Sequence, residues 1–331
     1  MSFRRKATYW AVSLAALAAG AGELRAIPLL DPTAPNYMSL YSLGSVPDID
    51  GKSGASFSYQ GLAITGNTLL MSVANGSSAI QTIWALPLVR DVQNHVVGFG
   101  APWDYAYAMP GGFSLGNTLA GGLIVTPEGL AYTTQSNNML GQYVDSSHTS
   151  SQFSLGSTGV VTGGIQELPG GASGQYKISS LNGDWYTVNT TGAFGSYNLG
   201  SYTVYNPGVS AYAFTYVPAG GTFQEARIVL GDANTQRLDA YAIDAFGNPC
   251  NPNVNASCAP VVHLVTNNLA IGYGVVRDPV TGDILFTTQA NDIWVLSDPL
   301  PEPSTVLMGF GGLGLMAWVA HRRKRQNSSL S

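Results

Sequence analysis

The sequence predicts an all-β body, a β-propeller of five or six blades, and three observations carry this prediction. The body, from Ile27 to Asp298, is rich in glycine, poor in charge and dense in Val, Thr, Tyr and Phe, which favour strands. No helical period extends over a dozen residues, and turn signals divide the body into short runs. One pattern also recurs along the chain. A β-sandwich is the alternative architecture.

The turn signals are clusters of Gly, Pro, Asn and Asp between apolar runs, which favour tight turns between neighbouring strands. They lie at residues 65–67, 126–129, 168–171, 182–183 and 278–282. Short strands joined in this way fit a sandwich, a barrel or a propeller. Internal repetition therefore decides among these architectures.

The clearest repeat relates residues 122–137 to residues 274–291. Each copy reads as a glycine, an apolar strand, a turn with Gly and Pro, and a second strand ending in Thr-Thr-Gln-x-Asn. Weaker copies begin near residues 61, 164 and 208, so the starts are 42 to 66 residues apart. This spacing is near the roughly 40 to 50 residues of a four-stranded propeller blade. Residues 89–110 leave room for a sixth unit.

The repeat makes specific predictions about packing. Its opening glycine lets the inner strands approach one another closely around a channel. Tyr132 and Phe286 hold matching places in the second strands, so we expect both to be buried between adjacent blades. Trp84 and Trp294 fall where a third strand belongs.

The recurring turn with Pro and Gly followed by a strand is similar to NHL-type and gluconolactonase-type propellers. A lactonase-type site would gather an acidic side chain and one or two Asn side chains around a divalent cation in the channel. Asn75, Asn137 and Asn291 hold equivalent places in their units and are the candidate ligands under that alternative. We otherwise expect no metal and no cofactor.

Residues 1–26 have the features of a signal peptide that directs export. Arg4, Arg5 and Lys6 give a positive start, residues 9–21 are apolar, and cleavage is expected after Ala26. An uncleaved signal anchor is the alternative. Export implies signal peptidase and the secretion machinery as partners.

Residues 299–331 form a second terminal signal. Pro301, Glu302 and Pro303 precede an apolar run, predicted as a transmembrane helix over about residues 304–320. A basic cluster follows, formed by Arg322, Arg323, Lys324 and Arg325. Such a cluster stays on the cytoplasmic side of a membrane. The segment resembles the PEP-CTERM sorting signal, and that resemblance implies an exosortase as a partner, with the three residues as the recognised motif.

The apolar run is short for a permanent anchor. Residues 306–320 number 15, and a helix of that length rises about 23 Å. The hydrocarbon core of a bilayer is about 30 Å thick. The length favours transient attachment to the membrane followed by cleavage, with an ordinary single-pass anchor as the alternative.

The charge balance of the body excludes one class of partner. Six basic residues stand against 17 acidic residues between Ile27 and Asp298. A surface of this kind repels nucleic acid and anionic lipid. We therefore expect no nucleic-acid partner.

The two cysteines indicate an oxidising compartment. Cys250 and Cys258 flank a loop rich in Asn and Pro, and a disulfide closing that loop is the favoured interpretation. A metal site or two free thiols are the alternatives.

The sequence shows no His-based zinc motif and no phosphate-binding loop. His95, His148 and His263 have no second His at ligand spacing, and no Gly-x-x-x-x-Gly-Lys segment is present. Residues 48–51 resemble the start of a calcium loop, but Tyr59 stands at the twelfth position, where such a loop needs Glu. Asp283 and residues 232–234 are interpreted as turn residues.

Aromatic residues favour a binding role. The stretches at residues 103–107, 185–186 and 202–205 contain Trp and Tyr, which stack on sugar rings, although cross-strand packing is their commoner use. The sequence thus predicts an exported envelope or extracellular-matrix protein, not an enzyme, whose body is a binding or structural module. Exopolysaccharide or matrix components are the expected contacts. A metal-dependent lactonase-like hydrolase is the alternative.

Overall fold

The computed structural model describes most of the body of the chain. The described ranges are 28–35, 38–46, 57–75, 82–106, 122–134, 139–144, 149–155, 162–220, 223–232, 234–266, 271–288 and 290–297. The predicted signal peptide and the predicted C-terminal sorting segment lie outside these ranges. In the part of the chain that is described, no helix has the length and apolar character needed to cross a membrane.

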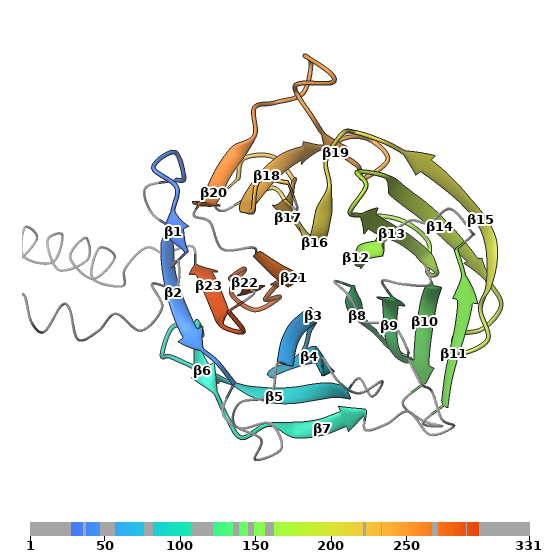
Figure 1. Ribbon diagram of the computed structural model, residues 1–331, viewed down its shortest axis with the longest axis horizontal. Helices are drawn as coiled ribbons and strands as arrows, with labels where there is room; N and C mark the ends of the chain where they lie inside the picture. Colours follow the sequence, from blue (N-terminus) through green and yellow to red (C-terminus); the bar gives the residue numbers. More distant parts are fainter. Residues whose placement is uncertain are drawn as a thin grey trace, which may run out of the picture.

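The described residues form a five-bladed β-propeller. Five antiparallel sheets surround a common centre, and the strands β3 (Phe57–Thr65), β8 (Leu123–Thr126), β12 (Thr162–Glu167), β16 (Ala211–Val217) and β21 (Ile271–Arg277) lie innermost (Figure 1). This arrangement confirms the propeller prediction and excludes the sandwich.

The first three blades follow one another along the chain. Blade 1 contains β3 (Phe57–Thr65), β4 (Thr68–Asn75), β5 (Thr82–Arg90), β6 (Val96–Phe99) and β7 (Trp103–Ala106). Blade 2 contains β8 (Leu123–Thr126), β9 (Gly129–Thr134), β10 (Met139–Val144) and β11 (Thr149–Ser154). Blade 3 contains β12 (Thr162–Glu167), β13 (Gln175–Ser180), β14 (Trp185–Thr191) and β15 (Asn198–Tyr205).

The last two blades are completed by the N-terminal strands. Blade 4 contains β16 (Ala211–Val217), β17 (Arg227–Asp232), β18 (Arg237–Ile243), β19 (Pro249–Cys250), β20 (Val262–Thr266) and β1 (Leu29–Leu30). Blade 5 contains β21 (Ile271–Arg277), β22 (Ile284–Thr288), β23 (Ile293–Ser297) and β2 (Ser39–Gly44). Because β2 pairs with β23, the start of the body closes the ring on its last sheet.

Residues 89–110 do not supply a sixth blade. The strands β6 and β7 both pair with β5, so the described part of this segment widens blade 1. They have no inner strand of their own. Two additional apolar runs in the sequence therefore do not establish an additional blade. One long strand, here β5, can pair with two short strands at different points along its length.

The repeated units are equivalent in register. Tyr132 lies opposite Leu123 in blade 2, and Phe286 lies opposite Val275 in blade 5. Both aromatic side chains are buried between neighbouring blades, as predicted, with exposed fractions of 1% and 0%. The glutamines of the Thr-Thr-Gln-x-Asn segments, Gln135 and Gln289, are predicted to lie at matching depths in the two blades, but both lie outside the described residues.

The glycine that opens each copy of the clearest repeat permits close approach at the axis. A Cβ on Gly122 would stand 2.9 Å from the backbone N of Ile165 in the next blade. A Cβ on Gly274 would stand 2.3 Å from the carbonyl O of Gln60. Both contacts are shorter than real Cβ atoms make, which explains the glycine that opens each copy of the clearest repeat.

An ion pair and hydrogen bonds reinforce the closure between blade 5 and blade 1. The guanidinium of Arg90 donates from Nη1 and Nη2 to the carboxylate of Asp278, at 2.6 and 3.0 Å. Asp283 accepts from the backbone N of Val96 at 3.3 Å and lies 2.9 Å from Nδ1 of His95. Both aspartates come from the β21–β22 turn, whereas their partners come from blade 1. These bonds hold blade 5, the last blade along the chain, against blade 1.

Cys250 and Cys258 form a disulfide, as the sequence predicts, with Cα atoms 5.5 Å apart. The loop that the disulfide closes packs back on the propeller, because the side-chain amide of Asn251 donates to the carbonyl of Pro207 at 2.9 Å. The disulfide therefore stabilises a loop that rests on the link between blades 3 and 4.

Candidate functional site

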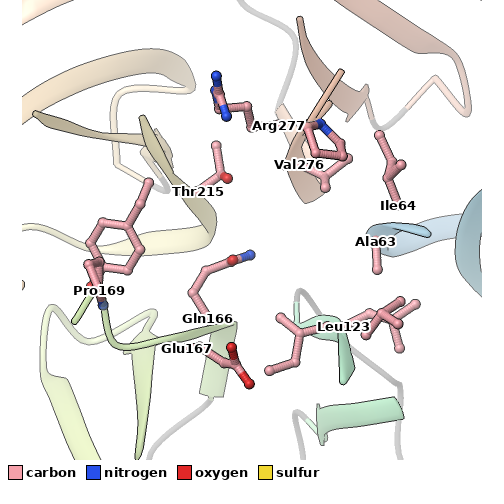
Figure 2. Close-up of a pocket in the computed structure, with 13 residues that line it drawn as sticks. Ala63, Ile64, Leu123, Gln166, Glu167, Pro169, Thr215, Val276 and Arg277 are labelled. Atoms are coloured by element: carbon pink, nitrogen blue, oxygen red, sulfur yellow. The ribbon is translucent and has the colours of Figure 1, made fainter. Parts of the chain in front are cut away.

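The candidate site is the mouth of the central channel where the five inner strands end. A cavity of about 320 Å³ opens there, and every blade contributes to its wall (Figure 2). The lining residues are Ala63, Ile64, Leu123, Ile124, Val125, Gln166, Glu167, Pro169, Thr215, Tyr216, Val276, Arg277 and Pro279. The volume lies at the lower end of the range for small-molecule sites, about 300 to 1,000 Å³.

The wall of this channel mouth has two chemically different sides. Blades 1 and 2 contribute only aliphatic side chains to it, at positions 63–64 and 123–125. Blades 3, 4 and 5 contribute Gln166, Glu167, Thr215 and Arg277. Figure 2 shows Ala63 across the cavity from Gln166 and Thr215. A bound molecule would meet an apolar surface on one side and hydrogen-bonding groups on the other.

Arg277 is the distinctive residue of the channel mouth. Its side chain is half-buried, and its Nε is fully covered yet has no hydrogen-bond partner among the described residues. The described residues give its guanidinium no ion pair either. Burying part of a charge without a partner costs free energy. Such a group is therefore a candidate for contact with a ligand.

The other described cations of the body all have partners. Arg90 pairs with Asp278, Arg237 pairs with Asp239 at 3.4 Å, and Arg227 donates to the carbonyl of Pro260 at 3.1 Å. Lys177 donates to Thr187 and to Asn248. The unpaired state of Arg277 therefore distinguishes it within the described part of the chain.

The turn after β21 explains why Arg277 is unpaired. Its neighbour Asp278 is already bound by Arg90, by the Thr281 hydroxyl at 2.7 Å and by the backbone N of Val280. Burial raises the pKa of Asp278, but these hydrogen bonds, with that from Arg90 foremost, outweigh it and hold the pKa below its usual range. The nearest carboxylate in sequence is thus engaged with the closure.

Gly282 gives the Arg277 side chain room. Its φ of +84° is a left-handed backbone conformation that favours glycine. A Cβ there would also stand 3.2 Å from Nη2 of Arg277. The backbone of the turn therefore favours glycine, and the guanidinium of Arg277 lies close against it.

Glu167 is the only acidic side chain that lines the described cavity. It is exposed and forms no ion pair with Arg277 among the described contacts, although both side chains border the same space. Opposite charges thus stand at the channel mouth without neutralising each other. The mouth can therefore receive a molecule that carries both an anionic group and hydrogen-bond donors.

The described histidines take part in structural pairs. His95 contacts the carboxylate of Asp283 at 2.9 Å and the hydroxyl of Ser297 at 3.0 Å. Both partners meet the same atom, Nδ1, whereas a nucleophilic Ser-His-Asp triad uses both ring nitrogens. His263 similarly contacts Asp239 at 2.8 Å. His148 lies outside the described residues.

Asp283, which the sequence predicts as a turn residue, has a second role in the structure. The residue lies in the β21–β22 turn, but it is fully buried and forms part of the closure. Asp232 does act as a turn residue, because it accepts from the backbone N of Asn234 at 2.7 Å and of Thr235 at 3.1 Å.

The candidate metal ligands are placed by the structure only in part. The side-chain oxygen of Asn291 accepts a hydrogen bond from the backbone N of Tyr59 at 3.2 Å, so it joins blades 5 and 1. Asn137, the side chain of Asn75 and residues 48–51 lie outside the described residues. Within the described ranges, no three His, Cys, Asp or Glu side chains are placed to hold a metal ion. The absence of catalysis stays a prediction.

The aromatic stretches divide between packing and exposure. Trp185 is fully buried and its ring centroid lies 4.8 Å from that of Phe214, across the junction of blades 3 and 4. Tyr202 and Tyr205, on the outer strand β15, are 40% and 42% exposed. The side chains of residues 103–107 lie outside the described residues.

Sequence reasoning missed the residues of the channel mouth. Gln166 and Glu167, Thr215, and Arg277 come from the ends of three inner strands, β12, β16 and β21, which are far apart in the sequence with no fixed spacing between them. One usable signal existed. Arg277 directly precedes the Asp-Pro turn of the clearest repeat, and the other copy has the apolar Val125 at the corresponding strand end.

Comparison with known proteins supports the identity of the C-terminal segment. Residues 299–324 match the family model described as the PEP-CTERM protein-sorting motif. The match covers the Pro-Glu-Pro motif, the apolar run and most of the basic cluster predicted as a sorting signal. No curated protein matches this chain.

Solved structures similar to this chain include a WD40 domain, a β-propeller domain and an extracellular domain. The WD40 domain of Pan2 from Neurospora crassa is 6% identical over 81% of this chain and 98% of its own, with a TM-score of 0.39. The Cps50 (Swd1) β-propeller domain from Myceliophteria thermophila is 8% identical over 72% and 83%, with a TM-score of 0.36. The extracellular domain of BT4673 from B. thetaiotaomicron is 15% identical over 72% and 27%, with a TM-score of 0.35. No function follows from these similarities.

Proposed function

We propose that this protein is an exosortase-processed component of the cell envelope or extracellular matrix, and that its propeller binds a ligand at the channel mouth without catalysis. The sorting motif at residues 299–324 supports the destination. The unpaired Arg277, beside an aliphatic wall built by two other blades, supports the binding role. Of these, the state of Arg277 carries the proposal.

Export and processing follow one route. The N-terminal signal directs the chain to the secretion machinery, and signal peptidase cleaves it after Ala26. The C-terminal apolar run then enters the membrane, and the basic cluster holds its end on the cytoplasmic side. The exosortase recognises Pro301, Glu302 and Pro303 and removes the tail. The propeller is thereby delivered outside the membrane.

The body suits an exposed location. Its disulfide is stable in an oxidising compartment. The pairing of β2 with β23 completes the sheet of the last blade, and the Arg90–Asp278 ion pair joins that blade to the first. A closed ring has few exposed sheet edges, which protects it against aggregation outside the cell.

The lining of the channel mouth favours binding over hydrolysis. Polar catalysis at a channel needs several convergent acidic, Asn or His side chains, and the described cavity offers Glu167 alone among the acids. An aliphatic wall and a free cation provide contact area and charge recognition. Matrix components such as exopolysaccharide are the ligands that fit the proposed location.

Mass spectrometry of the protein recovered from the cell surface tests the processing. The mature chain should begin near Ile27 and lack residues 306–325. The Glu302→Ala variant should keep the tail, and Glu225→Ala, which removes an exposed carboxylate of the body, serves as the matched control. A wild-type mass that includes the tail would refute the processing route.

A further inference from the structure

We propose that the channel mouth selects a small carboxylate that also carries hydrogen-bond donors, with Arg277 as the group that recognises the carboxylate. This inference rests on the proposed binding function and names the ligand class. It applies equally to two sources of the same chemistry, a hexuronate with hydroxyl donors and an aliphatic amino acid with an ammonium group.

The anionic part of the ligand follows from Arg277. A guanidinium presents its N–H groups in a planar fork that matches the two oxygens of a carboxylate. In the structure Arg90 binds Asp278 in this manner, with two bonds at 2.6 and 3.0 Å. Arg277 stands one residue before that aspartate but has no such partner among the described residues. A ligand carboxylate would supply the missing pair.

The donor groups of the ligand follow from Glu167 and Gln166. Both line the cavity from β12, across the channel from the β21 end that carries Arg277. A carboxylate accepts hydrogen bonds and cannot donate them when ionised. Glu167 would therefore repel a second anionic group and attract hydroxyl or ammonium donors. A simple dianion is a poor ligand for this arrangement.

The apolar part of the ligand and its size follow from the aliphatic wall that blades 1 and 2 contribute to the cavity. Residues 123–125 and Ala63 present only aliphatic surface, so the ligand needs a C–H face or an alkyl side chain on that side. A cavity of about 320 Å³ holds one ring-sized or amino-acid-sized molecule. The end of a polymer could enter with one residue, whereas a folded protein could not.

Calorimetric titration of the mature protein with two matched pairs of compounds tests the ligand class. Glucuronate is compared with glucose, and leucine with leucinol, because each second member lacks the carboxylate. We expect at least one carboxylate to bind about tenfold or more tightly than its neutral partner, as a charge-assisted pair provides. Equal binding within both pairs, or no binding of either carboxylate, would overturn the inference.

Variants then identify the site. Arg277→Gln should weaken the carboxylate about tenfold or more, and Arg277→Lys should recover part of the loss because it restores the charge without the fork. Arg227→Gln is the control, since that arginine contacts the carbonyl of Pro260. Unchanged affinity in Arg277→Gln would overturn the inference. Circular dichroism of each variant confirms that the propeller is folded.

A further variant separates the two sources. Glu167→Gln should weaken leucine about tenfold, because an ion pair with its ammonium group is lost, and should weaken glucuronate much less. The proposed binding function has its own readout. If the protein retains adhesion to purified envelope polysaccharide while neither carboxylate binds, the ligand class is wrong and the binding function survives. If the protein binds a carboxylate but does not adhere to purified envelope polysaccharide, the envelope role is refuted and the ligand class is not.

Discussion

The closure between blades 5 and 1 and the channel mouth meet at one turn, which joins β21 to β22, and they treat charge in opposite ways. On the closure side, Asp278 and Asp283 are fully buried and each is bound by a side chain of blade 1. On the channel side, Arg277 is partly buried with no partner among the described residues. The charged groups of the closure therefore have partners within the protein, whereas the guanidinium at the channel mouth has none among the described residues.

Neighbouring residues of this turn therefore have different roles: Asp278 and Asp283 stabilise the fold, and Arg277 is available for binding. A buried ion pair that loses one member leaves the other uncompensated, which is strongly destabilising. Removing an unpaired, partly exposed charge removes no interaction that the fold uses. Substitutions on the closure side should therefore change the free energy of unfolding, and substitutions at the mouth should change affinity.

The largest effect is expected from the apolar packing between blades. Phe286→Ala should lower the free energy of unfolding by about 3 to 5 kcal/mol, because a fully buried ring is removed. Tyr132→Ala should cost a similar amount, since it holds the equivalent place in blade 2. Urea unfolding followed by tryptophan fluorescence measures both. A loss under about 1 kcal/mol for either would show that the ring does not depend on these junctions.

The closure should give the next largest effect. Asp278→Ala should cost about 3 kcal/mol, because Arg90 loses its partner while its side chain remains only 12% exposed. A double-mutant cycle with Arg90→Ala isolates the pair, and the double variant should cost clearly less than the sum of the single variants. Additive costs would mean that the two residues act independently and that the closure is held elsewhere.

A smaller, pH-dependent effect is expected from Lys177, which is buried at the junction of blades 3 and 4. Burial lowers its pKa to about 8, against an opposing attraction to Asp244. The unfolded chain then binds more protons than the folded chain between pH 8 and the ordinary lysine pKa. The free energy of unfolding should therefore rise with pH through this interval, by up to about 1 kcal/mol per pH unit.

The Lys177→Met variant isolates this effect. It should lack the rise between pH 8 and 10, and urea unfolding at several pH values compares it with the wild type. Tyrosines whose pKa is raised by burial, such as Tyr216, act in the opposite direction above pH 10, so the interval below that pH is the informative one. An identical rise in both proteins would assign it to other groups.

The blades were predictable where local sequence determines them. The turn signals and the Thr-Thr-Gln-x-Asn repeat place β8, β9, β21 and β22, because each hairpin is built from neighbouring residues. The closing strand β2 was not predictable from these signals. Its pairing with β23 joins residues about 250 positions apart, and residues 39–44 share no pattern with the repeated unit.

The candidate site was less predictable than the fold, for a physical reason. The channel mouth is assembled from the ends of five strands, and its character depends on which charges are already paired. The pairing of Asp278 with Arg90, 188 positions away, leaves Arg277 free, and no local pattern records that contact. Asp283 shows the same limit, because its turn position was readable but its burial against His95 was not.

Urea unfolding of the wild type and of Arg277→Gln, each with and without saturating glucuronate or leucine, tests the division of roles most directly. Without ligand, the two proteins should agree to within about 0.5 kcal/mol, as expected for a residue that forms no ion pair or hydrogen bond among the described residues. At a ligand concentration of about one hundred times Kd, the wild type should gain about 2.7 kcal/mol and the variant much less. A variant that is already destabilised without ligand, or that gains as much as the wild type, would contradict the account.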